Sequence, residues 1–363
     1  MDVVLAGTDS LWLLRKARSE KDLELVATDE APLAPTVRAS NLPAIVGALP
    51  QDFRVIGPQA PLELASFSRE ARPCIGSVRA RTILGNLPPG AFLRVNGLSG
   101  KDLRIFVEGT ALTLTHMAAR LAQPIKEKTL TEQAAFFRLM SLASELCGTY
   151  GRDPTNPARG DCAWDVDPLC TALELKQSLV EVSGARGVRQ ARRAAGLVTP
   201  GSASPAESLL AMAMSPASLG GVPFPAFQHN KALSWPQDIN GLTKHRTMTP
   251  DFYWPQHSVA LEYDGARHAE EDRVWEDHRR QQDYTTCGIS LLCAQAEDLK
   301  SAGAIERLMR IVALQLATQE KAGFLQEVEA ALLKPGSSAA RATLISQLLP
   351  PNCSKTEGES QHS

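Results

Sequence analysis

A tight β-hairpin is the feature of this sequence that most constrains its fold. The stretch 249–268, TPDFYWPQHSVALEYDGARH, holds two runs with strand-like alternation, TPDFYWP and SVALEYD, on either side of a Pro-Gln-His turn. With the turn centred near Gln256, Asp251 is expected to lie opposite Leu261 and Glu262. The alternation therefore predicts a hairpin with two acidic side chains at its open end.

The acidic residues of this hairpin are expected to gather on or near one sheet face. Side chains alternate along a strand, so Glu262 and Asp264 point the same way, and Asp251 joins them from the facing strand. Three unpaired carboxylates would repel one another and raise each other's pKa values. A divalent cation relieves this repulsion, and carboxylate oxygens suit Mg²⁺ or Mn²⁺. The pattern predicts a Mg²⁺ or Mn²⁺ site.

The residues PDFYWP, followed by LEYDG and a nearby histidine, resemble the PD-(D/E)XK nuclease superfamily, and within it the very-short-patch-repair (Vsr)-like endonuclease domains of bacteria. The resemblance covers roughly residues 204–316, a typical length for one domain. It implies a restriction-endonuclease-like αβββαβ core, DNA as the substrate, and Asp251 and Glu262 as Mg²⁺ ligands. The backbone carbonyl of Tyr263 is expected to assist them.

The chain departs from that superfamily at one position. The family pattern places lysine two residues after the second acid, where this chain has Asp264. The catalytic base is thus unassigned, and Asp264 is either a second metal ligand or the group that positions His268. His268 itself is either the general acid or base, or a plain residue after an Asp-Gly turn.

Around the hairpin, the order of expected elements is helix, three strands, helix, strand, helix. A helix is expected at SPAESLLAMAM, a first strand within VPFPAFQHNKALSW, a helix over GARHAEEDRVWEDHRRQQDYTT, a buried strand at ISLLCAQ and a closing helix. On the second helix, Trp275 and Tyr284 are expected to pack inward, while Arg279 and Arg280 face outward as DNA contacts. His229 and His245 are expected to be surface residues.

Glu207 has two interpretations. Ser204 suits an N-cap and Pro205 the first turn, so Glu207 completes a capping box. The nuclease resemblance instead implies that this helix supplies an acidic residue to the metal site, which would make Glu207 catalytic.

A basic helix lies earlier in the chain, in ARGVRQARRAAG, where Arg186, Arg189 and Arg193 recur at helical spacing. Such a helix is either a solvated surface or a phosphate-contacting surface for DNA. Eight basic and three acidic residues lie between positions 176 and 246, although the whole chain has a net charge of −2. Any nucleic-acid surface must therefore be local.

The predicted organisation is α+β overall: a small α+β region over 1–105, a helical region over 106–200, the nuclease-like domain over 201–320, and a mostly disordered tail over 335–363. The segments SLWLLRKAR and FVEGTALTLTHMAARLA are similar to the front halves of abortive-infection (AbiEi-type) antitoxin proteins, which implies a toxin partner. Two functions remain open. One is a metal-dependent DNA endonuclease of repair or phage defence, and the other is a non-catalytic DNA-binding regulator or antitoxin with a degenerate nuclease-like domain.

Composition places the chain in the cytoplasm. The seven cysteines include no Cys-x-x-Cys pair, which fits a reducing compartment better than a disulfide framework. The N-terminus has no basic, apolar leader, and no apolar run approaches the length of a membrane span. The sequence therefore predicts a cytoplasmic protein without a membrane partner.

Overall fold

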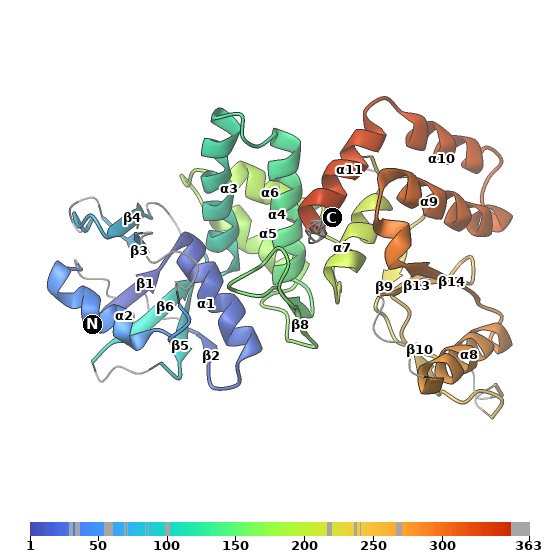
Figure 1. The fold of residues 1–363 in the computed structure, drawn as a ribbon, viewed down its shortest axis with the longest axis horizontal. Coiled ribbons are helices and arrows are strands. Elements are labelled where there is room, and N and C mark those ends of the chain that lie inside the picture. The colour runs from blue at the N-terminus through green and yellow to red at the C-terminus, as the bar shows by residue number, and fades with distance from the viewer. Residues whose placement is uncertain are drawn as a thin grey trace, which may run out of the picture.

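The computed structural model describes most of the 363 residues. The described ranges are 1–28, 32, 37–53, 61–68, 70, 72–83, 85, 87–98, 102–215, 220–235, 238–239, 241–265 and 271–349, with the backbone alone at 271–274. They form an elongated molecule with one sheet at each end and helices between them (Figure 1). The mixed α/β character expected from the sequence is confirmed.

The first sheet belongs to the N-terminal part and has six strands. Its order is β2 (Glu24–Ala27), β5 (Phe92–Asn96), β6 (Arg104–Glu108), β1 (Asp2–Leu5), β3 (Leu62–Ser66) and β4 (Val78–Thr82). The pairs β1–β6 and β3–β4 are parallel and the other pairs are antiparallel. Helix α1 (Gly7–Ser19) follows β1, and η1 (Ala39–Asn41) and α2 (Leu42–Ala48) follow β2. This part buries its own apolar cluster around Leu5, Leu13 and Ile45.

Four helices form the middle of the molecule: α3 (Thr110–Lys126), α4 (Glu132–Leu146), α5 (Ala172–Glu181) and α6 (Val188–Gly196). Helix α4 is buried along most of its length because it contacts α3, α6, α7 and α11 on different sides. The connector after α4 contains only the two-residue strands β7 (Tyr150–Gly151) and β8 (Ala163–Trp164). The main apolar core runs through α4 into the C-terminal part.

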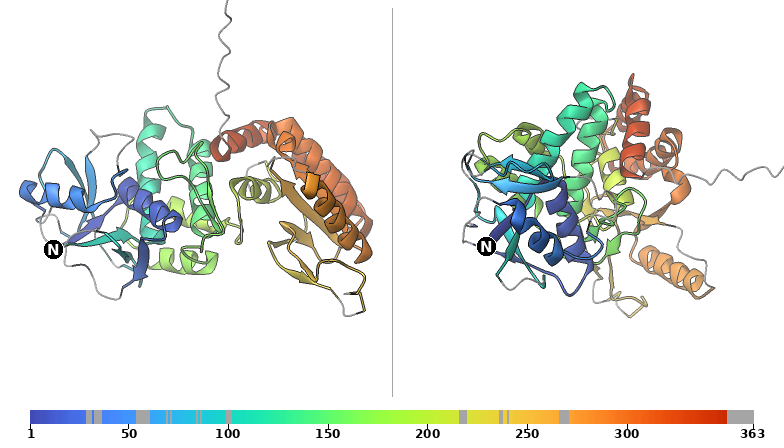
Figure 2. Two further views of the ribbon diagram at one scale, coloured as in Figure 1. Left: turned by 60° about the horizontal axis from the view of Figure 1, so that its bottom comes forward. Right: turned by 60° about the vertical axis from the view of Figure 1, so that its left-hand side comes forward.

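The second sheet carries the hairpin and has the order β14 (Ser290–Gln295), β13 (Val259–Asp264), β12 (Phe252–Trp254), β9 (Gln228–His229). Strands β13 and β14 are parallel, and the other neighbours are antiparallel. Helices α7 (Pro205–Ala213) and α9 (Ala302–Leu316) share the main core with one face, and α8 (Glu271–Thr286) packs on the other. Figure 2 shows α7 between the middle helices and this sheet.

The remaining elements complete the C-terminal part. Strands β10 (Leu233–Ser234) and β11 (Thr247–Met248) form a two-stranded sheet, and η2 (Ala296–Leu299), η3 (Ala317–Gln319), α10 (Phe324–Leu333) and α11 (Ser337–Leu348) follow β14. Within the described ranges, no helix combines the length and hydropathy needed to cross a bilayer.

Two expectations for this part were wrong. Disorder was predicted over 335–363, but Ser337–Leu348 forms α11, which packs on α4, α7 and α9 and buries Leu344 and Leu348. Strand β14 was expected to be buried, yet most of its residues are half-buried or exposed, because it is the edge strand. Residues 350–363 lie outside the described part of the chain.

Candidate active site

The predicted hairpin is confirmed, and its register places Asp251 beside Glu262. Phe252 pairs with Leu261 and Trp254 pairs with Val259, across a loop of residues 255–258. Phe252 and Leu261 both belong to the main core. The pair after Phe252 and Leu261 is Asp251 opposite Glu262. Because side chains alternate along each strand, these two point to the other face of the sheet, on which α8 packs.

Asp251 is the electrostatic centre of this site. Asp251 directly precedes β12, and its Oδ2 accepts the backbone N–H of Tyr263 at 2.6 Å. Burial, together with the negative charges of Glu207 and Glu262, raises the pKa of Asp251 to about 7 from an ordinary value of 3.8. The N–H of Tyr263 opposes this rise only in part. Asp251, Glu207 and Glu262 are thus close enough to repel one another. The sequence predicted such a cluster with Asp264 as its third member, whereas Asp264 is exposed and the third charge acting on Asp251 is that of Glu207.

Glu207 lies in the first turn of α7 and accepts a backbone N–H that precedes the helix, although the donor is Ala203 and not the N-cap residue of a capping box. Its role as a metal ligand stays a prediction. Ser204 caps α7 by accepting the N–H of Glu207 at 3.0 Å. Glu207 Oε2 accepts the N–H of Ala203 at 2.8 Å and the side-chain amide of Asn230 at 2.6 Å, and lies 3.5 Å from Nε2 of His229. Although burial acts in the opposite direction, these contacts hold the pKa of Glu207 below its ordinary range, so it remains ionised beside Asp251.

Glu262 is held from α8. Its Oε1 accepts Nη2 of Arg280 at 2.7 Å and the hydroxyl of Tyr284 at 2.8 Å. The prediction that Arg280 faces outward was wrong, because α8 packs on this sheet face through the fully buried Tyr284, one turn further on. Trp275, expected to pack inward, is 69% exposed instead, since it lies on the far side of α8. Arg279 is exposed, as predicted.

The three carboxylates share one arrangement of their oxygens. Each uses a single oxygen for protein contacts, and the second oxygen (Oδ1 of Asp251, Oε1 of Glu207, Oε2 of Glu262) has no hydrogen-bond partner within the described part of the chain. Such donors suit a hard cation. No group of three or more His, Cys, Asp or Glu residues in the described ranges is positioned to enclose a metal ion. Mg²⁺ commonly uses one or two carboxylates and keeps several waters, and Asp251 with Glu262 fits that mode.

The other predicted site residues are Asp264, Tyr263 and His268. Asp264 ends β13 with an exposed side chain, opposite Gln295 of β14. Tyr263 donates its N–H to Asp251 and pairs with Ala294, and its carbonyl stays a predicted ligand. His268 lies outside the described residues, so its role stays a prediction.

His229 and Asn230 were missed as site residues. His229 was expected at the surface, yet its side chain is 3% exposed. Strand β9 places it opposite Phe252, and the two rings stack with their centres 4.6 Å apart. Asn230 adopts a left-handed conformation (φ 47°) and donates its N–H to the Asp251 carbonyl at 3.0 Å. The polar residues Gln228, His229 and Asn230, which end the apolar run 222–227, were the only signal in the sequence.

His245 was also expected to be a surface residue, and its side chain is 25% exposed, but it has two carboxylate partners. Its ring lies between two carboxylates of α8, with Nδ1 2.7 Å from Asp283 and Nε2 2.6 Å from Glu276. Asp283 also accepts the backbone N–H groups of Lys244 and His245. These contacts fix α8 to the loop before β11 and hold Arg280 and Tyr284 against Glu262.

The basic helix has several structural tasks. It begins after Gly187, so Arg186 precedes it, and α6 packs on α3, α4 and α5. Arg192 donates to three carbonyls at the end of α5, and the Arg193 guanidinium lies 4.2 Å from the centre of the Phe136 ring. All three arginines of the predicted set, Arg186, Arg189 and Arg193, are exposed, but Arg193 lies over the Phe136 ring, so Arg186 and Arg189 are the two placed to meet a partner.

Comparison with known proteins adds no family to this description. No protein-family model, curated protein or solved structure matches this chain. We therefore infer function from the carboxylates, their partners and the topology that positions them.

Proposed function

We propose that this protein is a metal-dependent endonuclease that hydrolyses phosphodiester bonds of DNA, with Asp251, Glu262 and Glu207 at its catalytic centre. One observation carries the proposal. Glu207 of α7, Asp251 directly before β12 and Glu262 of β13 interact electrostatically, and burial together with the charges of Glu207 and Glu262 raises the pKa of Asp251 to about 7. Among the described residues, each of the three leaves one oxygen without a hydrogen-bond partner. Repulsion within such a cluster lowers the stability of the folded protein, and a bound cation would relieve it.

The order of elements supports the same proposal. Helix α7, strands β9, β12 and β13, helix α8, strand β14 and helix α9 come in this order along the chain, with the small β10–β11 pair between β9 and β12 and η2 before α9. Strands β13 and β14 are parallel. Apart from the β10–β11 pair and η2, this succession is the helix, three strands, helix, strand, helix order that the hairpin's resemblance to PD-(D/E)XK nucleases implies. Glu207 lies at the start of the first of these helices, where that resemblance implies an acidic residue.

The chain's own residues have separable tasks in such a reaction. Asp251 and Glu262 would hold Mg²⁺ or Mn²⁺, which when bound lowers the pKa of a bound water and neutralises charge on the scissile phosphate. The contacts from His229, Asn230 and Ala203 keep Glu207 charged and oriented toward the same place. Arg280 lies next to Glu262, and its guanidinium would contact the phosphate.

The position of Arg280 bears on the missing lysine. The residue two positions after Glu262 is Asp264, which is exposed and negative. Arg280 reaches the same acid from α8, so we assign to it the positive charge that the family pattern places on the strand. Arginine cannot act as a base at neutral pH. We therefore expect the attacking water to lose its proton to a carboxylate or to His268.

DNA would be held by exposed arginines. Arg279 neighbours the site on α8, and Arg186 and Arg189 are exposed on the middle helices. Contacts of this kind set affinity through the phosphate backbone and carry no sequence information.

A cleavage assay tests the proposal. Purified protein is incubated with supercoiled plasmid in Mg²⁺ or Mn²⁺, alongside Asp251→Asn, Glu262→Gln and the surface control Glu327→Gln, an exposed α10 acid paired with Lys321. We expect metal-dependent nicking by wild type and the control, and none by the two site variants. Equal nicking by Asp251→Asn, or none by wild type with either metal, would overturn the proposal.

A second candidate is a DNA-binding regulator or antitoxin whose nuclease-like part does not cut. The observation that favours it is the ion pair of 2.7 Å between Arg280 and Glu262, which occupies one of the two predicted ligands, together with Asp264 in place of lysine. This candidate predicts salt-dependent DNA binding without nicking, and the binding should be the same for wild type and Asp251→Asn.

A further inference from the structure

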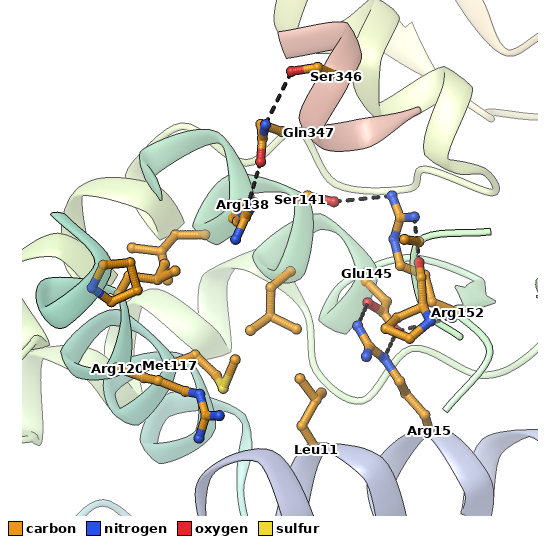
Figure 3. Close-up of a pocket in the computed structure, with 16 residues that line it drawn as sticks. Leu11, Arg15, Met117, Arg120, Arg138, Ser141, Glu145, Arg152, Ser346 and Gln347 are labelled. Atoms are coloured by element: carbon orange, nitrogen blue, oxygen red, sulfur yellow. Dashed lines mark hydrogen bonds and ion pairs between the residues drawn. The ribbon is translucent and has the colours of Figure 1, made fainter. Parts of the chain in front are cut away.

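A cavity of about 520 Å³ lies where the N-terminal part meets α11, and it is lined by other segments than the carboxylate site. It is lined by α1, α3, α4, the segment after β7 and the last turn of α11 (Figure 3). Small-molecule sites have volumes of about 300–1,000 Å³. The cavity therefore has the size of a small-ligand site, and it shares no residue with the proposed catalytic centre.

The lining is strongly positive. It includes four arginines and a single acid, namely Arg15, Arg120, Arg138, Arg152 and Glu145. The acid is already neutralised, because Arg15 donates to both of its oxygens at 2.7 Å and Arg152 adds its backbone N–H at 3.0 Å. Although burial opposes ionisation, the Arg15 guanidinium holds the pKa of Glu145 below its ordinary range.

Two of the other guanidinium groups have no carboxylate partner among the described residues. Arg152 is 9% exposed and donates only to neutral oxygens, those of Ser141, Pro157 and Leu348. Arg138 donates Nε to the side chain of Gln347 at 2.5 Å, and its two Nη groups have no partner in the described part of the chain. Arg138 is exposed at the rim, whereas Arg152 is buried and shares the nearby carboxylate of Glu145 with Arg15. Two arginines beside one carboxylate leave a net positive charge at a buried position, which favours an anionic ligand.

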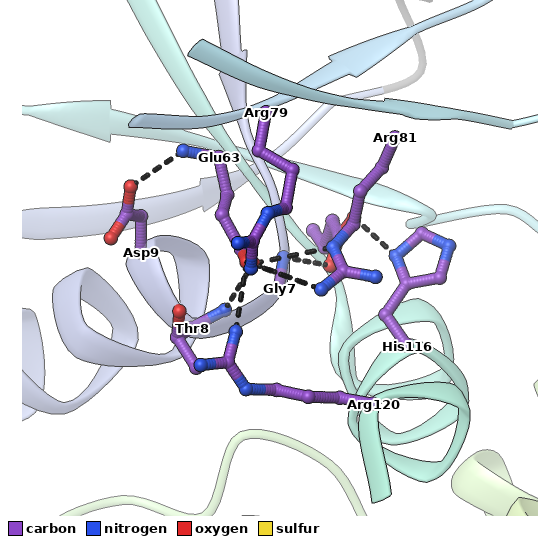
Figure 4. Close-up of polar contacts among 9 residues, drawn as sticks. Gly7, Thr8, Asp9, Glu63, Arg79, Arg81, His116 and Arg120 are labelled. Atoms are coloured by element: carbon purple, nitrogen blue, oxygen red, sulfur yellow. Dashed lines mark hydrogen bonds and ion pairs between the residues drawn. The ribbon is translucent and has the colours of Figure 1, made fainter. Parts of the chain in front are cut away.

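Arg120 brings a third cation to the rim from the opposite side. Its Nη1 donates to Glu63 at 2.8 Å, and Glu63 also accepts bonds from Arg79 and Arg81 (Figure 4). One carboxylate thus accepts hydrogen bonds from three arginines. Nη2 of Arg120 has no partner in the described ranges.

The walls between these arginines are apolar. They are formed by Leu11, Met117, Leu121, Leu139 and Leu142. Figure 3 shows Leu11 and Met117 on the side of the cavity between Arg120 and Arg15. An inorganic anion would leave this apolar surface wet, and an uncharged apolar molecule would leave the arginines without a counter-charge.

We propose that this cavity binds a small amphipathic anion, in which one phosphate or carboxylate group is joined to a planar or apolar body. The anionic group would contact Arg138 and Arg152, and the body would cover the leucine and methionine side chains. Two sources have this chemistry: a nucleoside monophosphate and an aromatic carboxylate. Because Gln347 of α11 bridges to Arg138 of α4, the ligand would also tie the C-terminal helix to the middle of the molecule.

Isothermal titration calorimetry of the full chain in EDTA tests this site without any contribution from a cation at the carboxylates. The probes are adenosine 5′-monophosphate, 1-naphthoate, inorganic phosphate and adenosine. The variant is Arg138→Gln, an exposed position, with Arg120→Gln as a second variant. The control is Arg307→Gln, which removes a surface arginine bonded to Asp298 on the far side of α9.

We expect one of the two amphipathic anions to bind with one-to-one stoichiometry and to raise the melting temperature. Inorganic phosphate and adenosine should each bind at least roughly tenfold more weakly, and Arg138→Gln should weaken binding roughly tenfold or more, since a charge-assisted hydrogen bond is lost. The control should bind as wild type does. Binding of adenosine 5′-monophosphate identifies a nucleotide site, and binding of 1-naphthoate alone identifies a carboxylate site. No saturable binding of either anion, or unchanged affinity in both Arg138→Gln and Arg120→Gln, would overturn the proposal.

Discussion

Asp251→Asn should stabilise the protein when divalent cations are absent. The substitution keeps the side-chain oxygen that accepts the N–H of Tyr263 and removes the charge that Glu207 and Glu262 oppose. The folded state holds the Asp251 proton more tightly than the unfolded state does, because its pKa lies at about 7 rather than at 3.8. Stability is therefore lost as the pH rises from about 4 to about 7, and the loss is complete above that range.

The size of the effect follows from that pKa. A tenfold change in an ionisation constant corresponds to about 1.4 kcal/mol, so full ionisation of Asp251 costs the folded state at most about 4 kcal/mol. Solvent relaxation around a half-buried carboxylate reduces this figure, and we expect a gain of about 2–4 kcal/mol for Asp251→Asn at pH 8. At pH 4 both forms are neutral at this position, so the gain should be close to zero.

Urea unfolding of wild type and Asp251→Asn in EDTA, at pH 4, 6 and 8, measures this difference. Glu327→Asn, at an exposed position paired only with Lys321, serves as a control for loss of a surface charge. Adding Mg²⁺ at pH 8 should stabilise wild type and narrow the gap. An unchanged or lower stability of Asp251→Asn at pH 8, or a gain that does not vary with pH, would refute the electrostatic reasoning.

Three further predictions follow from individual contacts. Glu207→Gln should lower Mn²⁺ affinity roughly 10–100-fold with little loss of stability. The control is Glu174→Gln, which changes a capping-box glutamate of α5 away from the site and should leave that affinity unchanged. Mn²⁺ titration of both variants decides whether Glu207 is a metal ligand or only a cap. Arg189→Glu should weaken binding to all DNA sequences and reduce the salt slope, as measured by fluorescence anisotropy, and an unchanged slope would make α6 a solvated surface. Arg341→Ala should lower the free energy of unfolding in urea by about 3 kcal/mol or more, because Arg341 is 1% exposed and its loss leaves Glu306 unpaired. A decrease below about 1 kcal/mol would contradict the inference that Arg341 holds α11 in place.

The hairpin could be predicted from the sequence because its information is local. Alternating apolar residues define both strands, and the register follows from the position of the turn. The facing positions of Asp251 and Glu262 needed nothing more. The start of α7 was also readable, since Ser204 and Pro205 are strong helix-start residues and Ser204 does cap the helix.

The inward direction of Arg280 could have been found with a stricter use of helical periodicity. Tyr284 was expected to pack inward, and Arg280 lies one turn before it on the same face. Trp275 lies nine residues before Tyr284, which puts it on the opposite side of the helix. Both errors came from taking residue type as a guide to burial on a helix whose other residues are nearly all polar.

Other features depend on contacts between distant segments. His229 is buried because a two-residue strand sets it against Phe252, and nothing near position 229 signals that pairing. Helix α11 lies in a tail that was expected to be mostly disordered because its sequence is polar and rich in proline and serine. It is held by tertiary bonds, since Arg341 contacts Glu306 and the carbonyls of Gly220 and Leu332.

The central claim is that Asp251 and Glu262 together hold a divalent cation. Anomalous diffraction from crystals soaked in Mn²⁺ tests it most directly, with Glu262→Gln crystals as the comparison. The account predicts one peak whose distances to an Asp251 oxygen and to Oε2 of Glu262 are about 2.0–2.3 Å, with Arg280 turned away from it, and a weaker or absent peak in the variant. A well-occupied Mn²⁺ peak that contacts neither carboxylate, or one that is unchanged in Glu262→Gln, would contradict it.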